Sequence, residues 1–204
     1  LPRYWVPEEE VQRRLLERGW EHKWLMGWRD ITNATNERTV IATVVPLTGC
    51  GNTLFLLFPN VANPRLYLCL LSNLNSFPVD FIARQKVSGT HLNFHVFKQL
   101  PVLPPNAYSP SDIEFVSLRA MELLYTTHQM KDFARCCGFE GPPFTWNVER
   151  RAALRAELDA YYAYLYGLDR DELRYILDPS DVYGADYPSE TFRVLKKNEV
   201  NRYG

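Results

Sequence analysis

The sequence lacks the short motifs that mark common catalytic and metal sites. Its 204 residues contain no glycine-rich phosphate loop, no Gly-x-Ser-x-Gly nucleophile elbow, no His-Glu-x-x-His zinc motif and no acidic pair spaced for metal-dependent phosphodiester cleavage. The four cysteines form no Cys-x-x-Cys pair, and Cys136 and Cys137 are adjacent, which suits neither a zinc site nor a disulfide framework. We therefore expect reduced thiols, a cytoplasmic protein and no bound metal.

Long apolar stretches are absent as well. No run of about 18 apolar residues, roughly the length that crosses a membrane as a helix, occurs, and the longest apolar stretch, residues 54–58, has the length of a strand. The sequence therefore predicts no transmembrane helix and no membrane partner. It begins Leu1-Pro2-Arg3 without an initiator methionine or a signal pattern, so we expect a piece of a larger protein.

An overall excess of positive charge is missing, since the net charge is −1, but the two halves of the chain differ. Residues 1–110 carry 11 Lys and Arg against 8 Asp and Glu, a net +3, whereas residues 111–204 carry 12 against 16, a net −4. Because phosphate binding needs positive charge, only the first half is an electrostatic candidate for nucleic acid. Residues 84–98 contain no acid, and their composition indicates either a basic strip or a solvated loop.

A proline cluster divides the chain. Pro101, Pro104 and Pro105 stand within five residues, which excludes a helix interior or a central strand there. The pattern is mixed before the cluster and helical after it, and the 46% of hydrophobic residues suffice for one good core or two small ones. The sequence therefore predicts an α+β protein, with a mixed domain of a small sheet and helices at residues 1–105 and a mostly α-helical region packing on it at 106–204.

The first half alternates between helical and strand patterns. Its apolar spacing predicts helices, at about residues 8–20, 66–74 and 78–86. Its β-branched and alternating stretches predict strands, at residues 39–47, 53–58 and 91–97. The first two strands are separated by a Gly49-Cys50-Gly51-Asn52 turn, and the third has a polar face.

The second half is predicted to be helical from its capping residues. One amphipathic helix follows Ser111-Asp112 to about Met130, and a second is capped by Asn147 and ends at Gly167. A third is opened by a capping box of Asp169 and Glu172 and closed by Pro179. These helices are expected to bury one apolar stripe, formed by Leu154, Leu158, Tyr161, Tyr162 and Leu165.

Several residues have two possible roles. Trp20, Trp24 and Trp28 are spaced by four, which favours core packing over base stacking. His91 and His95 are also four apart, but on a predicted strand without a nearby Cys or carboxylate this spacing does not favour a metal site. Six polar residues precede the first predicted strand. They are more typical of a buried polar network, or of a contact with another domain, than of contacts with DNA bases: Arg29, Asp30, Asn33, Asn36, Glu37 and Arg38.

Three segments in a fixed order carry a family resemblance. They are a helix ending in Asn-Ser, a basic helix end with a Gly-Thr loop that leads into a strand, and a proline exit: Leu70-Leu71-Ser72-Asn73-Leu74-Asn75-Ser76, Ala83-Arg84-Gln85-Lys86-Val87-Ser88-Gly89-Thr90-His91-Leu92-Asn93 and Leu100-Pro101-Val102-Leu103-Pro104-Pro105. This order resembles the target-recognition domains of type I restriction specificity subunits. Such domains are also fused to the methyltransferases of type IIG restriction-modification enzymes and BREX-type phage-defence systems.

The resemblance is strongest to large single-chain adenine-N6 DNA methyltransferases and extends over about residues 24–177. It is carried further by Trp28-Arg29-Asp30-Ile31-Thr32, Asn36-Glu37-Arg38-Thr39, Phe133-Ala134-Arg135, Gly141-Pro142-Pro143-Phe144 and Leu165-Tyr166-Gly167-Leu168. The Asn/Asp-Pro-Pro-aromatic tetrad of their active sites is absent, because Gly141 stands where a polar residue would accept the hydrogens of the amine. The resemblance thus implies the recognition part of such an enzyme without its catalytic domain.

The resemblance also implies partners and contact residues. The partners would be double-stranded DNA and an upstream methyltransferase domain, with S-adenosylmethionine bound by the parent enzyme and no cofactor or catalysis in this chain. DNA contacts are expected from Arg84, Lys86, Thr90, His91, Asn93, His95 and Lys98, and interdomain or DNA-backbone contacts from Arg29, Asn33, Asn36 and Arg38. Arg suits guanine and Asn suits adenine, whereas turn capping is the alternative for Thr90 and Asn93.

Two other functions are compatible with parts of the sequence. The acidic helical half, with its tyrosines, could form a protein-interaction domain that docks on the catalytic domain or on another defence protein. A self-contained nuclease would need a cluster of metal ligands, which the sequence does not show.

Overall fold

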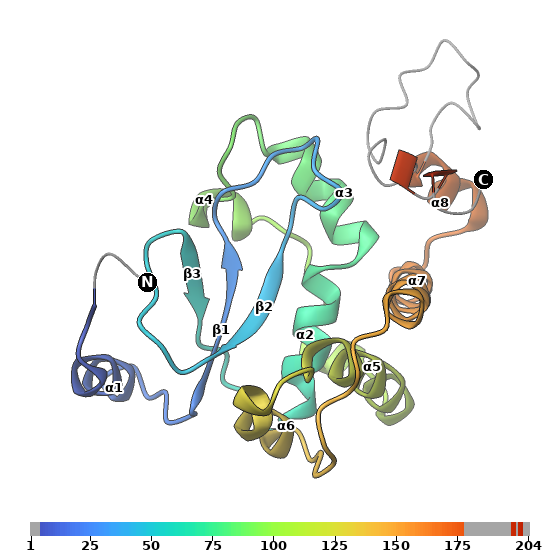
Figure 1. Cartoon of the computed structure of the whole chain (residues 1–204). Helices are drawn as coiled ribbons and strands as arrows, with labels where there is room; N and C mark the ends of the chain where they lie inside the picture. The colour runs from blue at the N-terminus through green and yellow to red at the C-terminus, as the bar shows by residue number, and fades with distance from the viewer. Residues whose placement is uncertain (1–4, 178–196, 199, 202–204) are drawn as a thin grey trace.

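The computed structural model describes residues 5–177, 197, 198, 200 and 201 of the chain (Figure 1). These residues form an α+β fold, with a small antiparallel sheet near the N-terminus followed by a mostly helical region, as the sequence predicts. The elements before the proline cluster are α1 (Glu8–Leu16), β1 (Trp24–Arg29), β2 (Ala42–Pro46), β3 (Leu54–Leu57), α2 (Arg65–Leu74), α3 (Phe77–Lys86) and α4 (Phe94–Phe97). Those after it are η1 (Pro105–Ala107), α5 (Pro110–Leu124), η2 (His128–Met130), α6 (Lys131–Cys136), α7 (Val148–Leu165) and α8 (Arg170–Leu177).

The sheet has the strand order β2-β1-β3, with both neighbours antiparallel to β1. Strands β2 and β3 confirm the two strands predicted around the Gly49–Asn52 turn, but they flank β1 and do not pair with each other. Strand β1 was not predicted, because every residue from Trp24 to Trp28 is buried and the strand has no alternation of apolar and polar positions. Such a two-sided burial pattern cannot be distinguished from a helix by its period.

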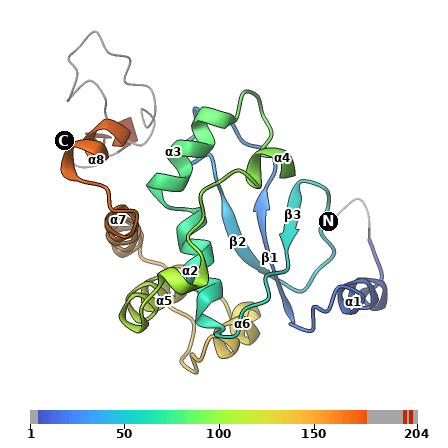
Figure 2. The ribbon, with the colours of Figure 1, turned by 180° about the vertical axis from the view of Figure 1, so that it is seen from behind.

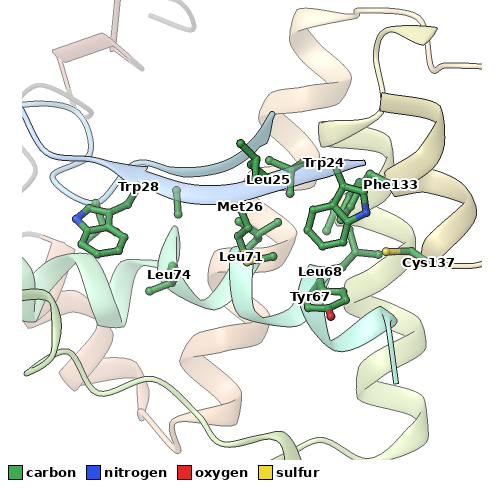
Figure 3. Packing of buried hydrophobic residues seen from close by; sticks show 14 of the residues in the cluster. Trp24, Leu25, Met26, Trp28, Tyr67, Leu68, Leu71, Leu74, Phe133 and Cys137 are labelled. Carbon is green, nitrogen blue, oxygen red and sulfur yellow. The ribbon is translucent and has the colours of Figure 1, made fainter. Parts of the chain in front are cut away.

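The three tryptophans lie in the core, as predicted. Trp24, Met26 and Trp28 project from one face of β1 toward α2, whereas Leu25 projects from the opposite face (Figure 3). The spacing of four places Trp24 and Trp28 on the same face because side chains of a strand alternate. Trp28 also stacks on Phe97 of α4, with 3.7 Å between ring centroids.

The helical region packs against the side of the molecule that carries α2 and α3. Helix α5 lies along α2, and α7 contacts both α3 and α5. Phe133 of α6 meets Trp24 edge to face, with 4.9 Å between centroids. Seen from behind, α1 lies beside β3 at one side of the sheet, while α7 and α8 lie at the other (Figure 2). One buried cluster therefore combines residues from both sides of the proline cluster.

Two of the three predicted helix starts in the second half are confirmed, those at Asn147 and Asp169. The first prediction is wrong in its bounds, because Ser109 caps α5, and this helix ends at Leu124 and not near Met130. The side-chain oxygen of Asn147 accepts a hydrogen bond from the Arg150 N–H at 2.8 Å, and Gly167 has a φ of 71° just after α7. Asp169 and Glu172 form the predicted capping box before α8. Pro179 lies outside the described residues. The predicted stripe is buried at Leu154, Leu158 and Tyr162 and half-buried at Tyr161 and Leu165.

The strand predicted at residues 91–97 is wrong. The chain makes one isolated bridge, between His91 and Ile31, and then forms the short helix α4. Asn93 caps this helix, because its side-chain oxygen accepts a hydrogen bond from the Val96 N–H at 3.1 Å. A local cap thus competes successfully with strand pairing, which is the usual effect of an Asn at such a position.

Among the described residues, no single helix has the length and apolar composition of a membrane span. Helices α2 and α3 meet those two criteria only as a pair, and the pair is bent by 49°. The four cysteines are free thiols.

Candidate nucleic-acid interface

The residues expected to contact DNA lie at the end of α3, in the following loop and around α4. Six of the seven are exposed, namely Lys86, Thr90, His91, Asn93, His95 and Lys98. The exception is Arg84, whose side chain is only 3% exposed.

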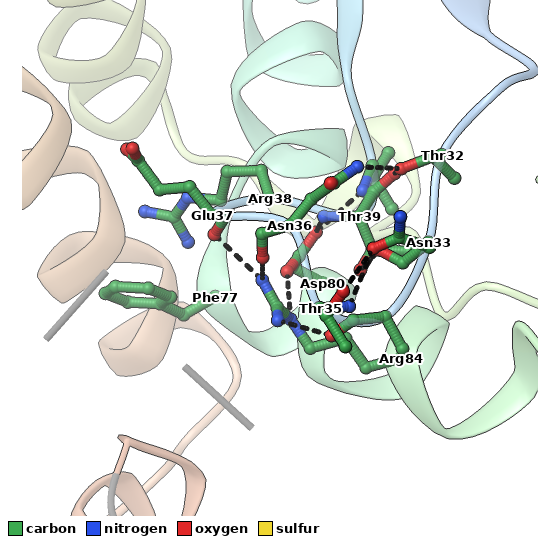
Figure 4. Close-up of polar contacts among 12 residues, drawn as sticks. Thr32, Asn33, Thr35, Asn36, Glu37, Arg38, Thr39, Phe77, Asp80 and Arg84 are labelled. Carbon is green, nitrogen blue, oxygen red and sulfur yellow. Dashed lines mark hydrogen bonds and ion pairs between the residues drawn. The ribbon is translucent and has the colours of Figure 1, made fainter. Parts of the chain in front are cut away.

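Arg84 is part of a buried polar network and not of the surface (Figure 4). Its Nε donates to Asp80 at 2.7 Å, one helical turn earlier on α3. Its terminal nitrogens donate to three backbone carbonyls of the preceding loop, those of Ala34, Asn36 and Glu37, at 2.8–2.9 Å. The expectation that Arg84 contacts DNA is therefore wrong, because its guanidinium is directed into the protein.

The same network fixes the loop of residues 32–39. The second oxygen of Asp80 accepts hydrogen bonds from the backbone N–H groups of Thr39 and Val40, at 2.8 and 2.7 Å. The Thr32 hydroxyl donates to the Thr39 carbonyl at 2.8 Å, which closes the base of the loop. Sequence reasoning missed Asp80, although an acid four residues before an arginine on a predicted helix indicates a pair.

The expected interdomain residues behave differently from one another. Asn33 and Asn36 take part in the polar network, since Asn33 accepts hydrogen bonds from the Thr35 N–H and hydroxyl and Asn36 donates to Thr32. Arg38 donates to Asp159 of α7 at 2.5 Å and lies 3.8 Å from the Phe77 ring centroid. A network is thus confirmed for these residues, whereas Arg29 is exposed.

Asp159 is a second buried acid that sequence reasoning missed. It also accepts a hydrogen bond from the Phe77 N–H at 2.9 Å. Burial raises the pKa of Asp159 to about 6, although Arg38 and the Phe77 N–H oppose this shift. The pair with Arg38 joins the fixed loop to α7 within the fold.

The exposed loop before α4 is held by one buried residue. Leu92 is fully buried, its N–H donates to the Asp30 carbonyl at 2.7 Å, and its carbonyl accepts from the Trp28 indole at 2.8 Å. The Thr32 N–H donates to the Thr90 carbonyl at 2.9 Å. The alternation predicted here is therefore present over residues 91–93, where His91 and Asn93 face solvent on either side of a buried anchor.

Two exposed side chains of this loop have fixed orientations. The His91 Nδ1 lies 2.7 Å from the carboxylate of Asp30, while 58% of the imidazole side chain is exposed. Asn93 caps α4, which confirms the capping alternative for this residue. The imidazole is thus oriented by a carboxylate and presents its other edge outward.

The charge around this loop is of one sign in the sequence. No Asp or Glu occurs between Asp80 and Asp112, so the exposed Lys86 and Lys98 have no acidic neighbour within this stretch. Lys86 donates to Gln99 at 3.1 Å, which places its ammonium beside α4. We call the exposed set Lys86, Thr90, His91, Asn93, His95 and Lys98 the basic edge.

The basic edge has the chemistry of a binding surface. It offers positive charge and hydrogen-bonding groups, the features that contact phosphates and base edges. Within the described residues, no group of three or more His, Cys, Asp and Glu side chains could hold a metal ion. The fold and this surface together define an α+β protein with an exposed polar and basic edge. No protein-family model, curated protein or solved structure matches the chain.

Proposed function

We propose that the chain is the DNA sequence-recognition module of a bacterial adenine-N6 DNA methyltransferase from a restriction-modification or related phage-defence system. Catalysis and S-adenosylmethionine binding would belong to another part of the parent enzyme, and double-stranded DNA and the methyltransferase domain would be its partners. The observation that carries the proposal is the basic edge, an acid-free stretch whose polar side chains face solvent from an anchored loop.

The anchoring of the loop favours recognition over a merely solvated loop. Because Leu92 is buried and both of its backbone polar groups are bonded, the flanking His91 and Asn93 are positioned before any ligand arrives. Preorganised contacts lose less entropy on binding. Lys86 and Lys98 supply charge for phosphates, and the neutral groups supply donors and acceptors for bases.

The proposal is tested by measuring binding to a fluorescent duplex by anisotropy between about 50 and 200 mM salt. We expect weak binding that falls steeply with salt, and at least a tenfold loss at low salt for Lys86→Glu with Lys98→Glu, because two phosphate contacts become repulsive. Arg84 is left unchanged because it supports the fold.

The matched control is Lys23→Glu with Lys131→Glu, which changes the same charge at exposed residues outside the basic edge. An equal loss in this control would show that only net charge matters. That result, or no binding by the unaltered chain at the lowest salt, would contradict the proposal.

A protein-interaction domain is the second candidate, favoured by exposed apolar side chains on the helical half. Tyr164 of α7 is 72% exposed and Leu118 of α5 is also exposed. Phe115 and Tyr161 stack between these helices with 4.0 Å between centroids, and Tyr164 lies 6.0 Å from Tyr161. Such a strip suits a partner protein better than DNA.

One comparison separates the two candidates. If the helical strip binds the methyltransferase domain, Tyr164→Glu should prevent capture by that domain and leave duplex binding unchanged. The Lys86→Glu, Lys98→Glu variant should show the reverse pattern. Loss of both activities in either variant would count against separate surfaces.

A further inference from the structure

A groove on the helical side of β2 lies outside the basic edge, and none of its lining residues belongs to that edge. It has a volume of about 700 Å³ and lies between β2, the end of the fixed loop, α5 and α7. Its floor is apolar and its rim is rich in arginine. We call it the arginine groove; its charged and aromatic lining residues are Arg29, Arg38, Arg151, Arg155, Glu37, Asp159 and Trp146.

The charge of the arginine groove favours an anion. Four arginines line it against two acids, and one of these acids, Asp159, is already paired with Arg38. Arg155 is 54% exposed and its contact with Glu37 is loose, at 3.8 Å. Arg29 is exposed as well. Arg155 and Arg29 thus line the groove with exposed guanidinium groups, and such groups bind phosphate in a bidentate manner.

The groove also offers an aromatic surface. Trp146, just before α7, is 63% exposed, which is unusual for a side chain of this size. The Arg151 guanidinium lies 3.7 Å from its ring centroid and is itself fixed by a hydrogen bond of 2.8 Å to the Leu123 carbonyl. Arg151 thus covers one face of the indole and fixes its position at the groove, so a planar ring would stack on the opposite face.

We propose that the arginine groove binds a nucleotide unit, with the heterocycle stacked on Trp146 and the phosphate held by Arg155 and Arg29. The volume lies within the range of about 300–1,000 Å³ that is usual for small-molecule sites. The same chemistry occurs in a free mononucleotide and in a single-stranded oligonucleotide. The half-buried apolar lining residues, Ile41, Leu123 and Leu124, would exclude water from one side of the ring.

The test is calorimetric titration of the chain with adenosine 5′-monophosphate and, separately, with a short single-stranded oligonucleotide. Binding of the mononucleotide would identify a free nucleotide as the ligand, and binding of the oligonucleotide alone would identify a strand; both support the site. We expect adenosine and inorganic phosphate each to bind at least tenfold more weakly than the mononucleotide, because each lacks one of the two recognised parts.

Variants assign the binding to the groove. Arg155→Glu and Trp146→Ala should each weaken binding at least tenfold, whereas Arg170→Glu, an exposed arginine of α8 outside the groove, should leave it unchanged. Unaltered thermal unfolding of the variants would show that they fold. The Lys86→Glu, Lys98→Glu chain should still bind the nucleotide, which separates this result from the proposed function. No binding of either ligand, or an equal loss in Arg170→Glu, would overturn the inference.

Discussion

Arg84 and Asp80 form an ion pair in the interior that holds the loop of residues 32–39 against α3. The Arg84 and Asp80 side chains are 3% and 0% exposed. A buried ion pair is tolerated only when further hydrogen bonds satisfy both partners. Here backbone N–H groups satisfy the acid and backbone carbonyls satisfy the base. The pair therefore acts as a clamp on the loop.

Removing Arg84 should destabilise the fold strongly. We expect Arg84→Met to lower the free energy of unfolding by about 3–5 kcal/mol, because the Asp80 carboxylate stays buried without its partner. Urea denaturation followed by circular dichroism measures this change. Lys86→Met, two residues along the same helix but exposed, should change stability by less than about 0.5 kcal/mol. Similar stability of the two variants would show that the clamp is unimportant.

Asp159 should give the protein a pH-dependent stability. Its pKa is raised from 3.8 to about 6 by burial, so between these values the folded chain keeps a proton that the unfolded chain has lost. The stabilisation is present in full below pH 3.8 and is lost as the pH rises through about 6. We expect this contribution to fall by about 2–3 kcal/mol across the window.

The measurement compares the unaltered chain with Asp159→Asn by urea denaturation at several pH values between 4 and 7. The difference in unfolding free energy between the two chains should change across this window, because only one of them carries the titrating group. A constant difference would mean that Asp159 titrates at its ordinary pKa in the folded state.

Strand β1 depends on a close approach to β3 that only glycine permits. A Cβ at Gly27 would lie 2.2 Å from the carbonyl oxygen of Phe55, which is backbone and cannot rotate away. The two strands would have to separate at the centre of the sheet. Because β1 carries Trp24 and Trp28 into the core, such a separation would also disturb the packing on α2.

Gly27→Ala is therefore expected to lower the free energy of unfolding by about 3 kcal/mol. Gly51→Ala is the matched control, because a Cβ there meets nothing within 4 Å. Thermal unfolding of both variants provides the comparison. If Gly27→Ala unfolds at the same temperature as Gly51→Ala, the contact between β1 and β3 is looser than described.

Local sequence patterns predict where helices begin but not which segments pair as strands. The helices with explicit capping residues, such as α7 and α8, begin where Asn147 and Asp169 predict, because a cap is a local hydrogen bond. Residues 91–97 have the period of a strand yet form a cap and the short helix α4. Whether a segment forms a strand depends on its pairing partner, and such a partner lies far away in the sequence.

At the scale of the whole molecule, the sheet region and the helical region share one core. Phe133, Met130 and Tyr125, all beyond the proline cluster, belong to the same buried cluster as Trp24 and Leu68. Removing the residues beyond the proline cluster would expose apolar surface to water, at a free-energy cost of about 25 cal/mol per Å². The boundary predicted near residue 105 thus separates two patterns of secondary structure that are packed together.

A chain of residues 1–105 alone should therefore not unfold cooperatively. We expect it to show a broad or absent thermal transition and binding of a hydrophobic dye, since the face of α2 that packs on α5 would be exposed. Differential scanning calorimetry beside the 204-residue chain makes the comparison. A sharp transition in the shorter chain would show that residues 1–105 form an independent domain.

The sequence by itself determined the α+β class, most of the helices with their caps, the strands on either side of the Gly49–Asn52 turn and the burial of the tryptophans. These follow from hydrophobic period and local hydrogen bonds, which depend on neighbours along the chain. Only the tertiary structure decided that β1 lies between β2 and β3 and that Arg84 is buried whereas Lys86 is exposed. The acid four residues before Arg84 indicates an ion pair but not its burial, which arises because the distant loop of residues 32–39 covers Arg84 and leaves Lys86 exposed.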